Sequence, residues 1–280
     1  MNVTLWGTRG SLATPGPDNA RYGGNTSCVS VLGDEGTVLV LDAGTGIRQM
    51  ASKIDPSVRR VDVLLTHLHM DHIQGLGFFV PLYRPGLEVH VWGPASTNVD
   101  LHARLMRYLS PPLFPVGLRE VPCDLHLHEL ADSEVEIGEF RVASARVCHP
   151  GPTVGYRITD FIGRSITYLP DHEPALGALT FPTLPRAWTS GGTLAHETDL
   201  LIHDSQYSAH EYPGHVGWGH SSLRHMLDFG TLVETRHLVP FHHDPGHSDA
   251  DLDRLMTEAM DEARPAYRVS PGCEGMSFRI

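Results

Sequence analysis

Residues 66–72, with the sequence THLHMDH, constrain this chain most strongly, because three imidazoles and a carboxylate fall within six positions. The apolar, partly β-branched run at 61–65 precedes them and predicts a buried strand, so the cluster lies where a strand ends and a loop begins. Residues two apart in an extended segment face the same way, which directs His67 and His69 toward one ion. Asp71 and His72, past the bend, can face a second ion.

Further polar side chains follow other predicted strands directly. His149 comes after the strand ending at 147, Asp171 after residues 167–170, and His242 after the strand 237–241. Side chains at strand ends can gather along one edge of the sheets, so these residues complete a set of metal-ligand candidates. His243 is the rival of His242, and the strand register favours His242.

The pattern His-x-His-x-Asp-His after a strand, with the later residues in the same order, resembles the metallo-β-lactamase fold hydrolases. The resemblance implies an α/β fold, a four-layer αβ/βα sandwich, and two divalent metal ions. It assigns His67, His69 and His149 to one metal, assigns Asp71, His72 and His242 to the other, and makes Asp171 the bridge between them. The histidine-rich set favours Zn²⁺, although Mn²⁺ or Fe²⁺ can use the same ligands.

Two such ions, about 3.5–4 Å apart, can hold a hydroxide nucleophile and clamp substrate oxygens, and Asp71 is therefore also expected to serve catalysis. That chemistry cleaves phosphodiesters, lactams, lactones and thioesters alike. The metal ligands alone do not select among these substrates.

The segments 201–207 and 217–222 resemble the phosphodiesterase branch of the fold, which includes ribonuclease Z. The resemblance implies that Asp204 orients His220, which protonates the leaving oxygen or holds a phosphate oxygen. This branch carries Glu at the acid position, where this chain has the shorter Asp. Arg9, Tyr207 and Trp218 are candidate substrate contacts, the two aromatic rings by stacking on a base.

Ribonuclease Z inserts a long tRNA-binding arm between the third histidine ligand and the bridging aspartate. In this chain the interval from His149 to Asp171 is 171 − 149 = 22 positions, which leaves no room for that arm. The net charge of −12 also argues against extended nucleic-acid binding, which favours basic surfaces. We therefore expect hydrolysis of a small phosphodiester, such as a cyclic nucleotide or cyclic sugar phosphate. An acyl hydrolase and a non-catalytic metal-bound sensor are the alternatives, and relatives suggest a homodimer.

Strand and helix patterns alternate along all 280 residues without a linker or repeat, which predicts a single domain over residues 1–280. The four cysteines are widely spaced, which favours reduced thiols and a cytoplasmic location. No signal peptide and no membrane-spanning run is recognised. The Gly-rich loops at 7–11 and 42–46 match no nucleotide-binding motif and are expected to line the site. The Pro/Gly-rich segment 174–193 is expected to be an insertion or lid.

The remaining patterns predict individual elements. We expect helices at 96–109 and 221–229, and a third helix opened by a capping box at 248–251. Residues 134–147 and 154–169 are expected to form two hairpins, and residues 267–269 and 276–280 a final pair of short strands.

Overall fold

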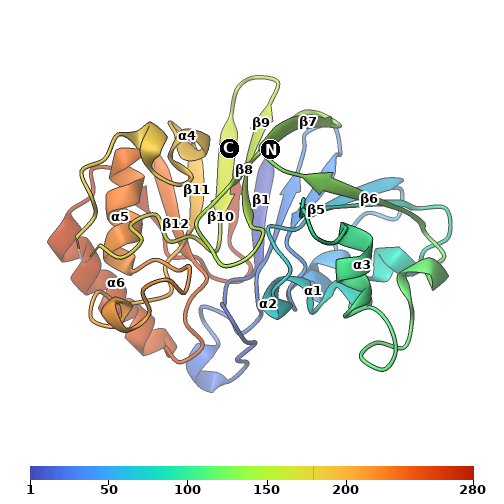
Figure 1. The fold of residues 1–280 in the computed structure, drawn as a ribbon, viewed down its shortest axis with the longest axis horizontal. Coiled ribbons are helices and arrows are strands. Elements are labelled where there is room, and N and C mark those ends of the chain that lie inside the picture. The colour runs from blue at the N-terminus through green and yellow to red at the C-terminus, as the bar shows by residue number, and fades with distance from the viewer. Residues whose placement is uncertain (179) are drawn as a thin grey trace.

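Two seven-stranded sheets pack face to face, with helices on both outer faces, in the computed structural model, which describes residues 1–178 and 180–280 (Figure 1). The order of the first sheet is β14-β1-β2-β3-β4-β5-β6, and that of the second is β13-β12-β11-β10-β9-β8-β7. This arrangement confirms the expected four-layer sandwich. Within each sheet, antiparallel strands at one side give way to parallel strands at the other, from β3 to β6 and from β10 to β13.

The strands of the first sheet are β1 (Asn2–Gly7), β2 (Cys28–Leu32), β3 (Val38–Leu41), β4 (Arg60–Leu64), β5 (Glu88–Pro94), β6 (Asp124–Leu130) and β14 (Ser277–Arg279). Those of the second are β7 (Ser133–Ile137), β8 (Phe140–Arg146), β9 (Val154–Asp160), β10 (Ser165–Leu169), β11 (Leu200–Asp204), β12 (His237–Phe241) and β13 (Arg268–Val269).

The helices connect the parallel strands and cover the outer faces. Helices α1 (Ile47–Ala51), α2 (Met70–Ile73) and α3 (Leu101–Met106) belong to the first half, and α4 (Gly192–Ala195), α5 (Leu223–Leu232) and α6 (Asp249–Ala263) to the second. One apolar cluster joins α1 and α3 to the first sheet, another fills the space between the sheets, and a third joins α4, α5 and α6 to the second sheet. Alternate residues of each strand therefore enter different clusters, as in β4, where Val63 packs outward and Leu64 inward.

The site is positioned by the carboxyl ends of strands from both sheets. In parallel sheets these ends lie along one edge, and loops leaving them can converge. The loops after β4, β8, β10 and β12 and the end of β11 carry the sequence-predicted polar residues to that edge. This is why side chains from 66–72, 149, 171, 204 and 242 can meet.

Several expectations need correction. The two terminal strands do not pair with each other, because β13 joins the edge of the second sheet beside β12 and β14 joins the first sheet beside β1. Strand β6 lies outside the expected elements, although its alternating His and Leu residues have the two-residue period of a strand. The helix expected at 96–109 is shorter, because Asp100 caps its start by accepting a hydrogen bond from the Ala103 amide. The capping box before α6 is confirmed.

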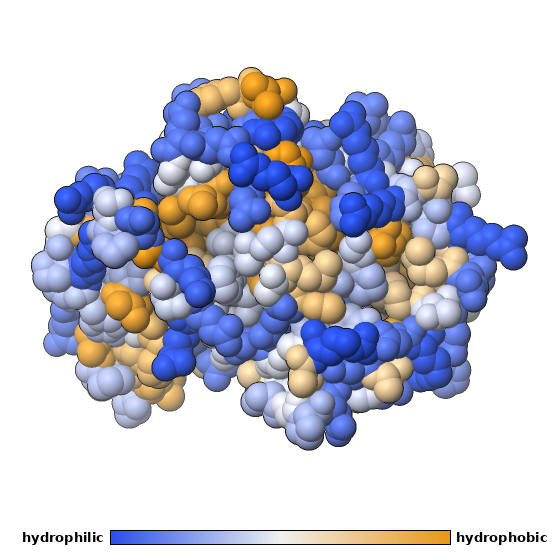
Figure 2. Space-filling model, turned by 180° about the vertical axis from the view of Figure 1, so that it is seen from behind, coloured by the Kyte–Doolittle hydropathy of each residue, from blue (hydrophilic) through white to orange (hydrophobic). Residues whose placement is uncertain are grey.

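The surface seen in Figure 2 is largely hydrophilic, and its apolar residues form separate patches. Among the described helices, none combines the length and apolar character needed to cross a membrane. All four cysteines are free thiols.

Candidate metal centre

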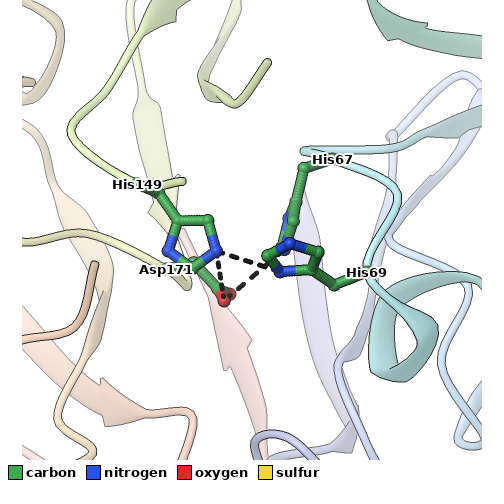
Figure 3. A group of neighbouring side chains, drawn as sticks. All are labelled: His67, His69, His149 and Asp171. Atoms are coloured by element: carbon green, nitrogen blue, oxygen red, sulfur yellow. Dashed lines mark hydrogen bonds and ion pairs between the residues drawn. The ribbon is translucent and has the colours of Figure 1, made fainter. Parts of the chain in front are cut away.

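His67, His69, His149 and Asp171 converge from the two sheets, as Figure 3 shows. His67 and His69 lie on the loop after β4, His149 follows β8, and Asp171 follows β10. The Nε2 atoms of His67 and His149 each lie 3.6 Å from Asp171 Oδ2, and His149 Nε2 lies 3.1 Å from His69 Nδ1. Four ligand atoms thus face one point, which suits a single ion.

Asp71, His72 and His242 form the adjacent group. His72 Nε2 lies 3.2 Å from Asp71 Oδ2 and 3.0 Å from Asp171 Oδ1, and His242 Nε2 lies 3.2 and 3.4 Å from the same two atoms. Asp171 therefore presents Oδ2 to the first group and Oδ1 to the second, the arrangement expected of a ligand shared by two ions. His242 has a left-handed backbone, with φ of 58°, a strain of the kind that functional sites retain.

The donor chemistry of both groups fits divalent metal ions. His67 Nε2 is buried and has no hydrogen-bond partner among the described residues, which is costly unless an ion is bound. In His72, His149 and His242, a hydrogen bond to Nδ1 orients the ring and leaves Nε2, which faces the cluster, free to coordinate. These bonds join Nδ1 of His72 to Asp42 Oδ2 (2.7 Å), Nδ1 of His149 to the Gly219 carbonyl (2.9 Å), and Nδ1 of His242 to Gln206 Oε1 (3.0 Å).

Asp42 is a buried residue that organises the site, and no motif in the sequence marks it. Besides His72, it accepts hydrogen bonds from the Thr66 amide and hydroxyl and from the Tyr168 hydroxyl, at 2.7–3.1 Å. It follows β3 and has φ of 59°. Its place at a strand end before a Gly-rich loop was the available signal, but the pattern did not reveal its contacts.

The electrostatics of the cluster suit cation binding. Burial lowers the pKa of His67, and likewise that of His149, so their imidazoles are neutral and able to coordinate. Burial disfavours the charged form of Asp71, but His72 and His242 outweigh it and hold the pKa of Asp71 far below its usual value. Burial lowers the pKa of His72, but Asp171 and Asp71 raise it well above the usual value, so a cation bound there would release a proton.

Asp204 and His220 lie directly beside the cluster. His220 Nδ1 donates to Asp204 Oδ2 at 2.7 Å, and Asp204 is fully buried at the end of β11. The His220 ring stacks on that of His242, with centroids 5.0 Å apart. Burial lowers the pKa of His220, but Asp204 reverses this effect and raises it to about 9. The shorter Asp side chain therefore still reaches its histidine.

His220 also lies close enough to Asp171 and His242 to be a metal-ligand candidate itself. The geometry allows it to serve as an acid or as a ligand. Its variants can distinguish the two roles.

The three expected substrate contacts have different positions. Arg9 is fully buried and donates to the carbonyls of Gly23, Asp244 and His247, so it fastens loops together and does not face a substrate. The expectation for Arg9 is therefore corrected. Tyr207 is buried with its ring stacked on His215 at 4.3 Å, whereas Trp218 is 60% exposed.

The loop that leads to His220 is held by Glu173, a buried residue missed in the sequence. Its carboxylate accepts hydrogen bonds from the amides of Gly217 and Gly219 and from the Tyr212 hydroxyl. In this loop, the ring of His215 stacks on that of Tyr207 and meets that of Trp218 edge-on. Trp218 therefore lies at the exposed end of this row of rings, two residues before His220.

The alternative ligands do not join the cluster. His243 points away and hydrogen-bonds the Gly272 carbonyl through Nε2 at 2.9 Å. Cys148, the neighbour of His149 in the sequence, is also absent from the described groups that could hold a metal. In the segment 174–193, Ser190 Oγ accepts from the Cys148 amide and contacts His172 Nε2, which anchors part of the segment against the site. Leu179, within that segment, lies outside the described residues.

Comparison with protein families gives a match of residues 37–243 to the family described as the beta-lactamase superfamily domain. Curated relatives include ribonuclease Z of Thermococcus gammatolerans, which is 28% identical over 162 residues, covering 56% of this chain and 48% of that protein. The match thus spans about half the length of this relative. Ribonuclease Z of Mycobacterium marinum is 27% identical over 262 residues, covering 86% of this chain and 87% of that protein.

Solved structures with the same fold include a diphosphatase from the PhnP family, with a TM-score of 0.69 and 17% identity, covering 100% of this chain and 97% of that one. Yeast PDE1 also has a TM-score of 0.69, with 14% identity and coverage of 100% and 99%. At these identities the likeness establishes the fold.

Proposed function

Because this chain belongs to the beta-lactamase superfamily and has its hydrolase fold, we propose that it is a metal-dependent phosphodiesterase acting on a small phosphodiester, such as a cyclic nucleotide or cyclic sugar phosphate. The observation that carries the proposal is the pairing of the buried Asp204 with His220 at the edge of the metal-ligand cluster. A thioester hydrolase has less need of such an acid, because a thiolate departs more readily than an alkoxide.

The chain's own residues provide the acid–base chemistry. Asp204 holds the imidazole of His220 with Nδ1–H toward the carboxylate, so that Nε2 is the atom that carries or returns a proton. The amides of Gln206 and Ser221 bond to the other Asp204 oxygen, at 3.0 and 3.2 Å, and fix the carboxylate in place. Protonation of a departing alkoxide is the step that this pair serves.

His67, His69, His149 and Asp171 would hold one divalent ion, and Asp71, His72 and His242 the other, sharing Asp171. Bound ions would act as Lewis acids toward the phosphate oxygens and would make water a competent nucleophile at neutral pH. The protein keeps its ligands oriented through Asp42, Gln206 and the Gly219 carbonyl.

A small substrate is favoured over RNA. The names ribonuclease Z and diphosphatase indicate cleavage of phosphate linkages in relatives and structural neighbours. In this chain, residues 149–171 hold only the hairpin of β9 with β10, and the net charge is −12. The exposed ring of Trp218 near His220 offers a stacking surface for a base or sugar.

The test is turnover by metal-loaded protein of bis(p-nitrophenyl) phosphate and a panel of cyclic nucleotides, with lactones, thioesters and a precursor tRNA in parallel. We expect turnover of at least one small phosphodiester. Exclusive turnover of acyl substrates, or of the tRNA, would overturn the proposal.

The variant His220→Ala separates the roles of this residue. Loss of a general acid should lower kcat about 100-fold for an alkoxide leaving group, and less for p-nitrophenolate, which departs without protonation. Metal content should stay at two ions per chain. Loss of one ion would identify His220 as a ligand, and an equal loss for both leaving groups would contradict the role as acid.

A further inference from the structure

A row of aromatic rings leads from His220, the proposed acid, to the surface of the molecule. The Tyr207 ring meets that of His220 edge-on, with centroids 6.0 Å apart, and stacks on that of His215 at 4.3 Å. The His215 ring in turn meets Trp218 edge-on at 4.9 Å. The row therefore begins beside the metal-ligand cluster and ends at Trp218, which is 60% exposed.

We propose that Trp218, held in place by Glu173, forms a subsite for a planar nucleobase, so that the substrate is a nucleotide and not a base-free sugar phosphate. The inference rests on the proposed function, because it places the base beside the proposed general acid. It names the part of the substrate that the metal ligands alone do not select.

Glu173 fixes the backbone on both sides of Trp218. One of its carboxylate oxygens accepts from the Gly217 amide at 2.9 Å, and the other accepts from the Gly219 amide at 2.8 Å. The carboxylate is buried, so it depends on these amides and on the Tyr212 hydroxyl for its hydrogen bonds. An exposed ring on a fixed backbone loses less conformational freedom when a ligand stacks on it, which favours binding.

The chemistry of the row favours a base over a bare sugar. The Tyr207 hydroxyl already accepts from Gln206 Nε2 at 3.3 Å. His215 Nδ1 donates to the Glu211 carbonyl at 2.9 Å. At least one face of Trp218 stays open, because its only ring contact among the described residues is edge-on. The row therefore offers mainly ring surface, which suits a stacked base, whereas sugar hydroxyls need free hydrogen-bonding groups.

The first experiment compares nucleotides with the same cyclic phosphates lacking a base. Metal-loaded protein is given adenosine 2′,3′- and 3′,5′-cyclic phosphates and the corresponding methyl riboside cyclic phosphates. We expect kcat/KM to be higher for a nucleotide by about tenfold or more, with the difference in KM. Equal kcat/KM for the two kinds of substrate would contradict the inference and leave the proposed function intact.

Substitutions at Trp218 test whether this ring supplies the preference. Trp218→Ala should raise KM for nucleotides about tenfold and leave kcat and the base-free substrates nearly unchanged, whereas Trp218→Phe should retain most of the preference. Phe161→Ala is the control, because Phe161 is a 76% exposed ring in the turn between β9 and β10. An unchanged preference in Trp218→Ala would count against the subsite.

The variant Glu173→Gln tests the support beneath the ring. Glutamine has the same shape, but its NH₂ group would face an amide that needs an acceptor. The preference for nucleotides should fall, because Trp218 is no longer held. Turnover that falls equally for both kinds of substrate, with the preference intact, would exclude Glu173 from the subsite.

Binding of the product separates this inference from the proposed function. Adenosine 5′-monophosphate and methyl riboside 5-phosphate are titrated into metal-loaded protein, with calorimetry and tryptophan fluorescence as readouts that need no turnover. We expect the nucleotide to bind about tenfold more tightly and to quench a signal that Trp218→Phe removes. Such binding without hydrolysis of any phosphodiester would refute the proposed function alone, whereas equal affinities would refute the nucleobase subsite.

Discussion

At the scale of single residues, the neighbours His242 and His243 show how finely the candidate centre is determined. Both are buried histidines after β12, yet only His242 faces Asp71 and Asp171, while His243 bonds the Gly272 carbonyl and meets the Tyr22 ring edge-on. The left-handed φ of His242 turns the chain so that successive side chains diverge.

These two histidines form a matched pair for mutation. His242→Gln should remove one of two bound ions and lower phosphodiester turnover about 100-fold or more, because one of two Lewis acids is lost. His243→Gln should keep both ions. Metal analysis and kcat/KM of the purified variants measure the difference, and loss of an ion from His243→Gln alone would reverse the assignment.

The sequence could predict the metal-ligand candidates because each one follows a strand with a clear apolar pattern. It could not predict Asp42, Glu173 or Gln206, because their importance lies in hydrogen bonds to residues far away in the chain. A substrate contact is the wrong expectation for Arg9 for the same reason, because a charged residue in a Gly-rich loop resembles a ligand contact until its buried carbonyl partners are known.

At the scale of elements, the loop between β11 and α5 brings His220, the proposed general acid, together with His149 of the cluster. Gly219 supplies the carbonyl that orients His149 and precedes His220. Its φ is +87°, and a Cβ there would lie 2.4 Å from His149 Nδ1. The position therefore requires glycine both for its backbone conformation and for its contact with His149.

Gly219→Ala should displace His149, weaken binding of the first ion and strain the loop by about 1–3 kcal/mol. Gly214→Ala is the control in the same loop, because a Cβ there meets nothing within 4 Å. Metal affinity and melting temperature of the two variants should differ clearly. Equal behaviour of both would show that the loop does not position His149.

The elements themselves were mostly predictable, because strands and amphipathic helices carry local apolar periods. The sheet to which each strand belongs was not predictable. Strands β13 and β14 are neighbours in the sequence, but they form the edges of different sheets. That choice depends on which edge remains unpaired after the rest has folded, which no local pattern encodes.

At the scale of the whole molecule, the candidate ligands join the two sheets. His67, His69, Asp71 and His72 follow the first sheet, whereas His149, Asp171 and His242 follow the second. Bound ions should therefore stabilise the packing of one sheet on the other. Removal of metal with a chelator should lower the melting temperature, and readdition of Zn²⁺ should restore it, since a ligand that binds the folded state adds RT ln(1 + [L]/Kd). An unchanged melting temperature would mean that the metal centre does not stabilise the packing of the two sheets.

Acid stability of the molecule should depend on a buried histidine pair behind the centre. His203 Nδ1–H donates to the Asp204 carbonyl, so its Nε2 accepts from His172 Nδ1 at 2.9 Å. Burial lowers the pKa of His203 from 6.5 to about 4, so the folded protein keeps it neutral while the unfolded chain takes up a proton below pH 6.5. The contribution of His203 to stability is thus complete above pH 6.5 and falls by about 1.4 kcal/mol per pH unit between 6.5 and 4. His203→Gln, whose amide can make both hydrogen bonds without titrating, should flatten this part of the profile. Urea unfolding of metal-free wild type and variant from pH 7.5 to 4.5 measures the slopes, and identical slopes would show that His203 is not responsible.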